Sequence, residues 1–409
     1  MKARKFLIIL IIIVLLSMTL MGLDSINAVD NLAYVVSIGF DIKDNGKLEL
    51  SFQIAIPSGG SESSSSSSSQ SSDSIINSVE CNSLESGINL VNSYLGKQLN
   101  LSHCKAIVFS EEIATKGIGE YVYTLMNNIE IRPTCNVIIS RCDAKYFLDN
   151  SKPMLEQLSS KYYEVSSTAE RSTGYTTDTT LQEFFSSMTD TFGECYAILG
   201  SVNNGNNSGG DAGISNGSDN SNIASETPID TQKNIETLGI AVFKDDKLVG
   251  ELNGLESISL LILRNHLKNA TLNIPSPFES TNFIDLYIEK SKCETYVDVI
   301  NGTPYIQSKL EISTRIISMS DDYKNLDKST IDIIEEYAKN YIESFIYDFV
   351  YKTSKELKSD IACFGKYAVS DFSTWQDWQD YNWLNNYQNA FFNIDATINL
   401  KSRYLIVDT

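Results

Sequence analysis

The chain begins with basic residues and an uncharged apolar run, a pattern typical of a segment that enters a membrane. Lys2, Arg4 and Lys5 precede Phe6–Leu23, which contains no charged residue. This length reaches the lower limit for a helix that crosses a bilayer, and the basic flank predicts that the N-terminus stays inside. The pattern predicts an N-terminal membrane helix, with cleavage after Ala28 as the alternative.

The residues that follow predict a β-hairpin. A largely apolar run covers Leu32–Asp41, and a turn sequence follows at Asn45 and Gly46. Apolar side chains then occur at every second position, as expected for a strand. These positions are Leu48, Leu50, Phe52, Ile54 and Ile56. A serine-rich tract at residues 58–74 predicts a flexible surface loop.

Between residues 84 and 140 the apolar pattern switches between the period of a helix and that of a buried strand. Helices are predicted at 84–95 and 117–128, and strands at 104–110 and 135–140. Strands that alternate with helices after an opening hairpin indicate a mixed α/β domain with a mixed sheet.

A segment rich in Gly, Asn and Ser at residues 201–235 predicts a linker between two halves of the chain. The predicted domains are an anchor at 1–28, a mixed α/β domain at 29–200 and a C-terminal α+β domain at 236–409, which is divisible in two. The expected fold class is α+β or mixed α/β, with a membrane helix followed by two to three mixed-sheet domains.

The C-terminal half contains longer elements. A second hairpin is predicted at 238–252, a short helix at 255–265 and a strand-rich stretch at 283–318 with a turn at Asn301-Gly302. An apolar stripe predicts a long helix that continues to Leu357. The stripe consists of Ile334, Ala338, Tyr341, Phe345 and Phe349. The last predicted strand carries alternating apolar residues at Ile394, Ala396, Ile398 and Leu400.

The acidity of the chain excludes one class of function. The net charge is −20, and loss of residues 1–28 would leave −22, because that segment holds three basic residues and one acidic residue. A general nucleic-acid binder needs a basic surface, so no nucleic-acid partner is expected.

Seven scattered cysteines have neither the density of a disulfide framework nor a C-x-x-C spacing. We predict free, partly buried thiols, with one incidental disulfide as the alternative. The positions are Cys81, Cys104, Cys135, Cys142, Cys195, Cys293 and Cys363.

Residue types that carry catalysis are scarce. The only histidines are His103 and His266, and although His103 is adjacent to Cys104, neighbouring residues in a strand point to opposite faces. The sequence lacks zinc-protease, serine-hydrolase and phosphate-loop motifs, and residues 41–46 do not complete a calcium loop. A pair of glycosidase-type carboxylates could not be recognised from linear spacing. No catalytic residue, metal site or cofactor is predicted.

Three tryptophans near the C-terminus, Trp375, Trp378 and Trp383, have two interpretations. They could form a platform on which a sugar or peptide stacks. Their spacing also fits a short amphipathic helix that packs against the last strand, and we favour this second interpretation.

Four segments, taken in order, resemble the Ger(x)C family, the C subunits of spore germinant receptors. They are DNLAYVVSIGFDIKDNGKLELSFQIAIP at 30–57, KAIVFSEEIATKGIGEYVYTLMNNIEIRPTCNVIIS at 105–140, LGIAVFKDDKLVGELNGLES at 238–257 and TSKELKSDIACFGKY at 353–367. The resemblance extends from about residue 24 to the C-terminus, interrupted by the serine-rich tract and the linker.

The resemblance implies a non-enzymatic, extracytoplasmic subunit of a receptor in the inner membrane of a bacterial spore. Its partners would be an A subunit and a polytopic, permease-like B subunit, and small nutrients would trigger the complex. The implied fold has three mixed α/β domains. Two alternatives are a membrane-tethered enzyme that acts on cell wall or spore cortex and a solute-binding protein. The scarcity of histidine argues against the first, and the lack of a two-lobed, doubly wound pattern argues against the second.

One position departs from the family pattern. Members typically carry a Cys that becomes lipid-modified, and Leu23 stands in its place. Because acylation requires the thiol, we assign the anchor to the basic residues Lys2, Arg4 and Lys5 and to the helix that runs from Phe6 to Leu23.

Overall fold

The computed structural model describes residue 4 and residues 31–56, 74–151, 159–166, 170–204, 222–229, 233–279, 281–320 and 328–401. Of the predicted anchor, Arg4 alone is included. Lys2, Lys5 and the run from Phe6 to Leu23 lie outside the described residues, as do residues 57–73 of the serine-rich region. Within the described ranges no helix is both long enough and apolar enough to span a bilayer.

The predicted hairpin forms the start of the fold. Strands β1 (Leu32–Ile42) and β2 (Leu48–Ala55) pair antiparallel, as predicted. Gly46 has a φ of 77° in the turn between them, a conformation that residues with a side chain rarely adopt. The pair becomes three-stranded because β3 (Ser74–Cys81), which the sequence pattern does not predict, pairs antiparallel with β2.

Strand β2 is buried on both faces. Its apolar residues are buried as predicted, but Ser51 and Gln53 between them are buried too. The Gln53 side-chain oxygen accepts hydrogen bonds from Ser37 Oγ at 2.7 Å and from Tyr163 Oη at 3.1 Å. These bonds satisfy a polar side chain that would otherwise be costly to bury.

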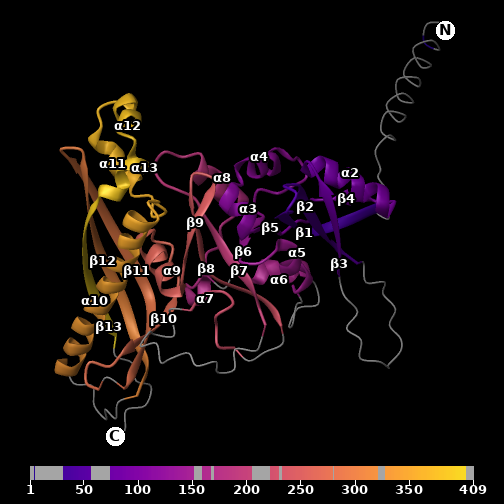
Figure 1. The fold of residues 1–409 in the computed structure, drawn as a ribbon. Helices are drawn as coiled ribbons and strands as arrows, with labels where there is room; N and C mark the ends of the chain where they lie inside the picture. The colour runs from indigo at the N-terminus through magenta and orange to yellow at the C-terminus, as the bar shows by residue number, and fades with distance from the viewer. Residues whose placement is uncertain are drawn as a thin grey trace.

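A mixed sheet of nine strands contains these three, in the order β3-β2-β1-β5-β6-β7-β8-β9 with β4 beside β1 (Figure 1). Its centre, β1-β5-β6-β7, is parallel, and both ends are antiparallel. The predicted strands at 104–110 and 135–140 are confirmed as β5 and β6. The remaining strands are β4 (Gln98–Asn100), β5 (Ala106–Ser110), β6 (Asn136–Ser140), β7 (Tyr196–Asn203), β8 (Asn234–Lys244) and β9 (Lys247–Leu252).

Helices cover both faces of this first sheet. The predicted helices at 84–95 and 117–128 are confirmed as α2 and α4, and Ile118, Val122 and Leu125 are fully buried as expected. One face packs against α2 (Leu84–Leu95), α3 (Glu111–Lys116), α4 (Gly119–Asn127) and α8 (Leu181–Met188). The opposite face packs against α5 (Ala144–Asp149) and α6 (Ser159–Ser166), and the short α7 (Glu170–Thr173) lies near the second sheet.

The segment predicted as a linker, residues 201–235, connects β7 to β8, and these two strands are hydrogen-bonded neighbours. The first sheet therefore continues through β8 and β9, which the sequence pattern assigns to the C-terminal half. The predicted boundary therefore does not separate the two sheets. The sequence does not reveal this, because strands that pair across a long polar insertion leave no signal in the local periodicity. The domain limits themselves stay a prediction.

A second mixed sheet has the order β10-β11-β12-β13. Its long central hairpin turns at Asn301 and Gly302, with φ values of 51° and 80°, and the predicted turn and strand-rich stretch are confirmed. The last predicted strand is confirmed as β13, which pairs parallel with β12. The four strands are β10 (Ala270–Pro275), β11 (Phe283–Ile300), β12 (Thr303–Met319) and β13 (Phe391–Lys401).

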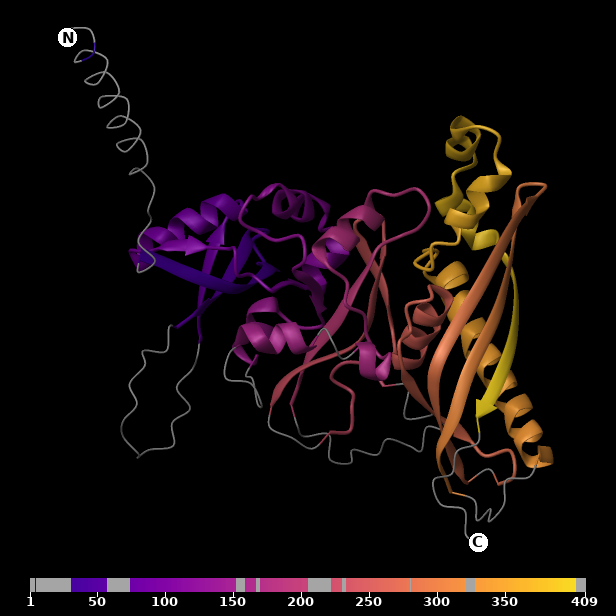
Figure 2. The ribbon, with the colours of Figure 1, turned by 180° about the vertical axis from the view of Figure 1, so that it is seen from behind.

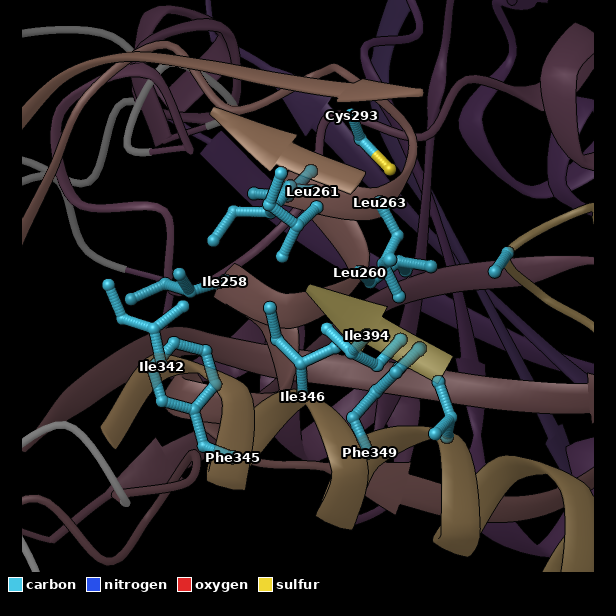
Figure 3. Close-up of a cluster of buried hydrophobic side chains, with 14 of the residues drawn as sticks. Ile258, Leu260, Leu261, Leu263, Cys293, Ile342, Phe345, Ile346, Phe349 and Ile394 are labelled. Atoms are coloured by element: carbon cyan, nitrogen blue, oxygen red, sulfur yellow. The ribbon is translucent and has the colours of Figure 1, made fainter. Parts of the chain in front are cut away.

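Two helices fill the space between the sheets. Helix α9 (Gly254–Leu263) lies between β8 and β9 of the first sheet and β11 of the second (Figures 1 and 2). The long predicted helix is confirmed as α10 (Lys328–Tyr351), whose apolar stripe faces α9 and β13. Figure 3 shows Ile258 and Leu261 of α9 beside Ile342 and Ile346 of α10 in one apolar core.

The C-terminal segment closes this core with short elements. They are the π-helical turn η4 (Lys352–Glu356), α11 (Gly365–Ala368), η5 (Val369–Asp371), α12 (Trp375–Tyr381), α13 (Trp383–Asn386) and η6 (Tyr387–Asn389).

Helix α10 also closes the free edge of β13. Backbone N–H groups of Ile394, Ala396 and Leu400 donate to Tyr347 Oη at 2.9 Å, Glu343 Oε1 at 2.8 Å and Glu335 Oε1 at 2.7 Å. Four residues of a helix rise about 6 Å and two residues of a strand about 6.6 Å. Acceptors spaced four and eight residues apart on the helix therefore match N–H groups spaced two and four residues apart on the strand. An unpaired strand edge is a template for aggregation, and these side chains occupy it.

We expect Glu343→Ala to lower the free energy of unfolding by about 1–3 kcal/mol, because the Ala396 N–H loses a charged acceptor. Glu343→Gln, which retains an acceptor oxygen, should recover part of that loss. Urea denaturation monitored by circular dichroism measures both changes.

Glu336→Ala is the matched control, because Glu336 is exposed on the same helix and makes no hydrogen bond or ion pair with the described residues. Equal effects of the Glu343 and Glu336 substitutions would show that the contact to β13 does not stabilise the fold.

Candidate functional site

The adjacent pair His103 and Cys104 does not form a nucleophilic site. The His103 ring lies edge-on to Tyr34, with centroids 5.0 Å apart, whereas the Cys104 thiol is buried and donates to the Ala106 carbonyl at 3.4 Å. A hydrogen bond with Cys135 and burial raise the pKa of Cys104 well above its usual range, which disfavours the thiolate. All seven cysteines are free thiols, and the described residues contain no cluster suited to a metal ion.

The tryptophan cluster is largely part of the core. Trp378 and Trp383 are buried and stack with centroids 6.0 Å apart, which confirms that both are packed. They lie on two separate helices, and Trp378 packs against Phe192 and Phe372 instead of the last strand. Trp383 contacts Tyr387, which in turn packs against Phe392 of β13. Trp375 is 52% exposed and lies edge-on to Phe192.

A buried carboxylate, Asp360, organises the junction between the two sheets. It accepts hydrogen bonds from Phe364 N and Gly365 N, both at 3.1 Å, and from Trp383 Nε1 at 2.8 Å. Its backbone oxygen accepts from Glu194 N at 2.9 Å. Burial raises the pKa of Asp360 to about 6, opposed by the three donors.

Close packing explains the glycine that follows. A Cβ atom on Gly365 would lie 2.5 Å from the Phe192 carbonyl oxygen and 2.7 Å from the Trp383 ring. Residues 190–195 and 358–367, far apart in the sequence, are therefore held in direct contact. Sequence periodicity does not reveal this junction. The one available signal is that Asp360 directly precedes a short apolar run, Ile361 to Phe364, ahead of the tryptophans.

A second buried carboxylate lies beside the first. Glu194 Oε2 accepts from Asp245 N at 2.8 Å, in the turn between β8 and β9, whereas Glu194 Oε1 has no hydrogen-bond partner. Burial raises the pKa of Glu194 to about 7, and the negative charge of Asp245 adds to this rise. An orphaned buried oxygen agrees with a carboxyl that is protonated in the folded protein near neutral pH.

We expect Trp383→Phe to lower the free energy of unfolding by about 2–3 kcal/mol, because a buried acceptor loses the shortest of its three donors. Trp375→Phe is the control, and since Trp375 is half exposed its loss should be below about 1 kcal/mol. Urea unfolding followed by the fluorescence of the remaining tryptophans separates the two. Similar losses would mean that the hydrogen bond from the Trp383 indole to Asp360 does not stabilise the fold.

Glu194 should also make stability depend on pH. The pKa of Glu194 is 4.5 in the unfolded chain and about 7 in the folded protein. Between these two pH values the unfolded chain loses a proton that the folded protein keeps, so the contribution of Glu194 to the free energy of unfolding falls as pH rises. Glu194→Gln should remove a slope of up to about 1.4 kcal/mol per pH unit between pH 5 and 7. Urea unfolding at several pH values measures this, with Glu336→Gln as the control. Parallel profiles of wild type and Glu194→Gln would refute the prediction.

In the part of the chain that the structure describes, no helix covers one face of the second sheet. Helix α10 lies in front of this sheet in Figure 1 and behind it in Figure 2, so the face turned to the viewer in Figure 2 is open. Side chains of β11 to β13 alternate between this open face and the core. Ion pairs occupy its middle and far end, one between Lys292 and Glu294 within β11 and one between Lys401 of β13 and Glu289 of β11.

Large apolar side chains gather at the hairpin end of the open face. Tyr305 and Phe391 stack with centroids 5.4 Å apart on neighbouring strands. Tyr296 and Ile300 of β11 point to the same side, and all four residues are between 44% and 60% exposed. We call these four residues the tip patch. Exposed clusters rich in aromatic residues are typical of surfaces that bind other proteins.

Comparisons with known proteins agree with the sequence and the fold. A model described as the spore germination protein N-terminal domain matches residues 25–202, and one described as spore germination B3/GerAC like, C-terminal, matches residues 238–403. The chain belongs to the spore germination GerAC family of C subunits. The two matched ranges meet at the predicted linker, although the first sheet crosses it.

Relatives in this family are distant but similar over nearly their whole length. YfkR of Bacillus subtilis (strain 168) is 18% identical over 93% of this chain and 92% of its own, and the spore germination protein GerQC of Bacillus cereus is 20% identical over 95% and 96%. The crystal structure of the GerBC protein is 14% identical, with a TM-score of 0.54 over 89% of this chain and 96% of that chain. That likeness shows the shared fold.

Proposed function

We propose that this protein is the non-enzymatic C subunit of a germinant receptor, held at the extracytoplasmic face of the spore inner membrane. It assembles with membrane-embedded A and B subunits and couples their nutrient sensing to germination. Family membership supports the class of protein, and the tip patch carries the further step to assembly, since it gives a partner protein an aromatic surface.

The anchor completes this proposal. The apolar run from Phe6 to Leu23 follows Lys2, Arg4 and Lys5, and the family's lipid-modified Cys is replaced by Leu23. A helix in place of a lipid would keep the folded part at the membrane surface, which its net charge alone would oppose because anionic lipids repel an acidic protein.

The proposal requires that germination depends on this chain and on its tip patch. In a strain that lacks its other germinant receptors, deletion of the gene should abolish germination with the corresponding nutrient while sporulation stays normal. Complementation with wild type should restore it. Complementation with the double variant Tyr305→Ser/Phe391→Ser should restore less than about a tenth of the rate, because hot-spot aromatic residues each contribute about 2 kcal/mol or more.

The matched control is Tyr94→Ser/Ile129→Ser, since these two apolar side chains are 80% and 99% exposed at the other end of the molecule. Immunoblots of spore membranes must show equal amounts of all variants. Full germination in the deletion strain would refute the receptor function. Full germination with only the tip-patch variant would refute the role of this surface.

A further inference from the structure

A cavity of about 400 Å³ lies between the start of α8 and the end of α9. This volume falls within the range of small-molecule sites, which is about 300–1,000 Å³. Its wall combines hydroxyl, basic and acidic side chains from segments on both sides of the inter-sheet core. They include Thr177, Asp178, Thr179, Tyr196, Arg264 and His266.

Arg264 is the positive group of this cavity and is held in place. Its Nη1 donates to the Ile361 carbonyl at 3.0 Å, and its guanidinium carbon lies 5.2 Å from the centre of the Tyr196 ring. Among the described residues no acceptor binds its other N–H groups. A fixed guanidinium with free donors is suited to a carboxylate, which it can bind with two parallel hydrogen bonds.

His266 and two hydroxyl groups add neutral polar contacts. Partial burial and the Arg264 charge lower the pKa of His266, which favours the uncharged form of its ring. Thr177 and Thr179 are buried, with their hydroxyl oxygens 3.2 Å apart. Hydroxyl groups can donate to one ligand atom and accept from another.

Asp178 is the negative group without a protein partner. Among the described residues it has no hydrogen bond, and no basic nitrogen lies within the 4.0 Å of an ion pair. Glu183 is already used, because it forms a capping box with Thr180 at the start of α8. The cavity thus presents a guanidinium with free N–H donors and a carboxylate without an ion-pair partner among the described residues, and the two do not pair with each other. The Arg264 charge also acts on the buried Asp360, whose pKa it lowers.

We propose that this cavity binds a small zwitterion of the α-amino acid type. Its carboxylate lies against Arg264 and its ammonium against Asp178, with the threonine hydroxyls between them. The proposal goes beyond assembly with partner subunits, because it gives this chain a ligand of its own. Arg264 is bonded to Ile361, the neighbour of Asp360, so the ligand would contact the junction that joins the two sheets.

Isothermal titration calorimetry on the full-length chain in detergent micelles tests this, with each standard L-amino acid titrated singly at pH 7. At least one should bind with saturation. Its decarboxylated amine and its deaminated acid, which each keep one of the two charges, should bind at least about tenfold more weakly, the effect of losing one charge-assisted hydrogen bond.

Two substitutions locate the ligand. Arg264→Met should weaken binding of the amino acid at least about tenfold. Arg315→Met is the matched control, since Arg315 also lies over a tyrosine ring, 4.6 Å from the centre of Tyr287, but on the open face of the second sheet. Asp178→Asn removes a group that bonds to nothing else described, so folding should be intact. This substitution should weaken binding of the amino acid and leave binding of the deaminated acid unchanged.

The outcomes separate clearly. No saturable binding of any amino acid at 10 mM would overturn the proposal, as would binding that neither substitution at the cavity changes. A deaminated acid that binds as tightly as its amino acid would overturn the zwitterion and leave a site for anions. None of these results bears on assembly, which the tip-patch variants test separately.

Discussion

Helix α9 is buried on all sides over most of its length, and this constraint determines how the two sheets are joined. Its residues from Ser257 to Leu263 are all buried. A helix of this kind needs a partner on every side, and neither sheet can supply that alone. Strands β8 and β9 cover one side, and β11 with α10 covers the other, so the helix forms the centre of a core shared by both sheets. The two sheets therefore share one apolar core.

Hydrogen bonds at the rim of this core fix the relative position of the sheets. Asp360 ties the segment after α10 to Trp383, and its backbone ties it to Glu194 at the start of β7. Lys352 adds an ion pair to Glu256 of α9 at 2.8 Å. Since α10 also occupies the edge of β13, the second sheet has one closed edge, one covered face and one open face. The tip patch is thus presented on a rigid element, as a binding surface requires.

Much of the fold could be predicted because its elements carry clear periodicity. The two-residue alternation of β13, the apolar stripe of α10 and the hairpin of β1 and β2 each follow from local patterns. The continuation of the first sheet into β8 and β9 could not, since it depends on pairing across the insertion between Asn203 and Asn234. Strand β3 was missed because Ser74–Cys81 mixes polar and apolar residues without a strict period and follows a serine-rich tract.

The two proposed binding surfaces were harder to predict than the elements that carry them. Tyr305 and Phe391 look like ordinary strand residues in the sequence, and they are exposed because no helix among the described residues covers that face. Arg264 and Asp178 are far apart in the chain and meet at one cavity only after folding. The missing thiol at Leu23, in contrast, is visible in the sequence alone, because one atom decides whether a lipid can be attached.

The central claim is that the tip patch contacts membrane subunits of a receptor. Photo-crosslinking tests it most directly, with a photoreactive phenylalanine analogue placed at position 305 in the spore membrane and, for comparison, at position 94 on α2. We expect position 305 to give a crosslink to an A- or B-type subunit, identified by mass spectrometry, and position 94 to give none. Absence of a crosslink to either subunit from position 305, in spores that germinate normally, would contradict it.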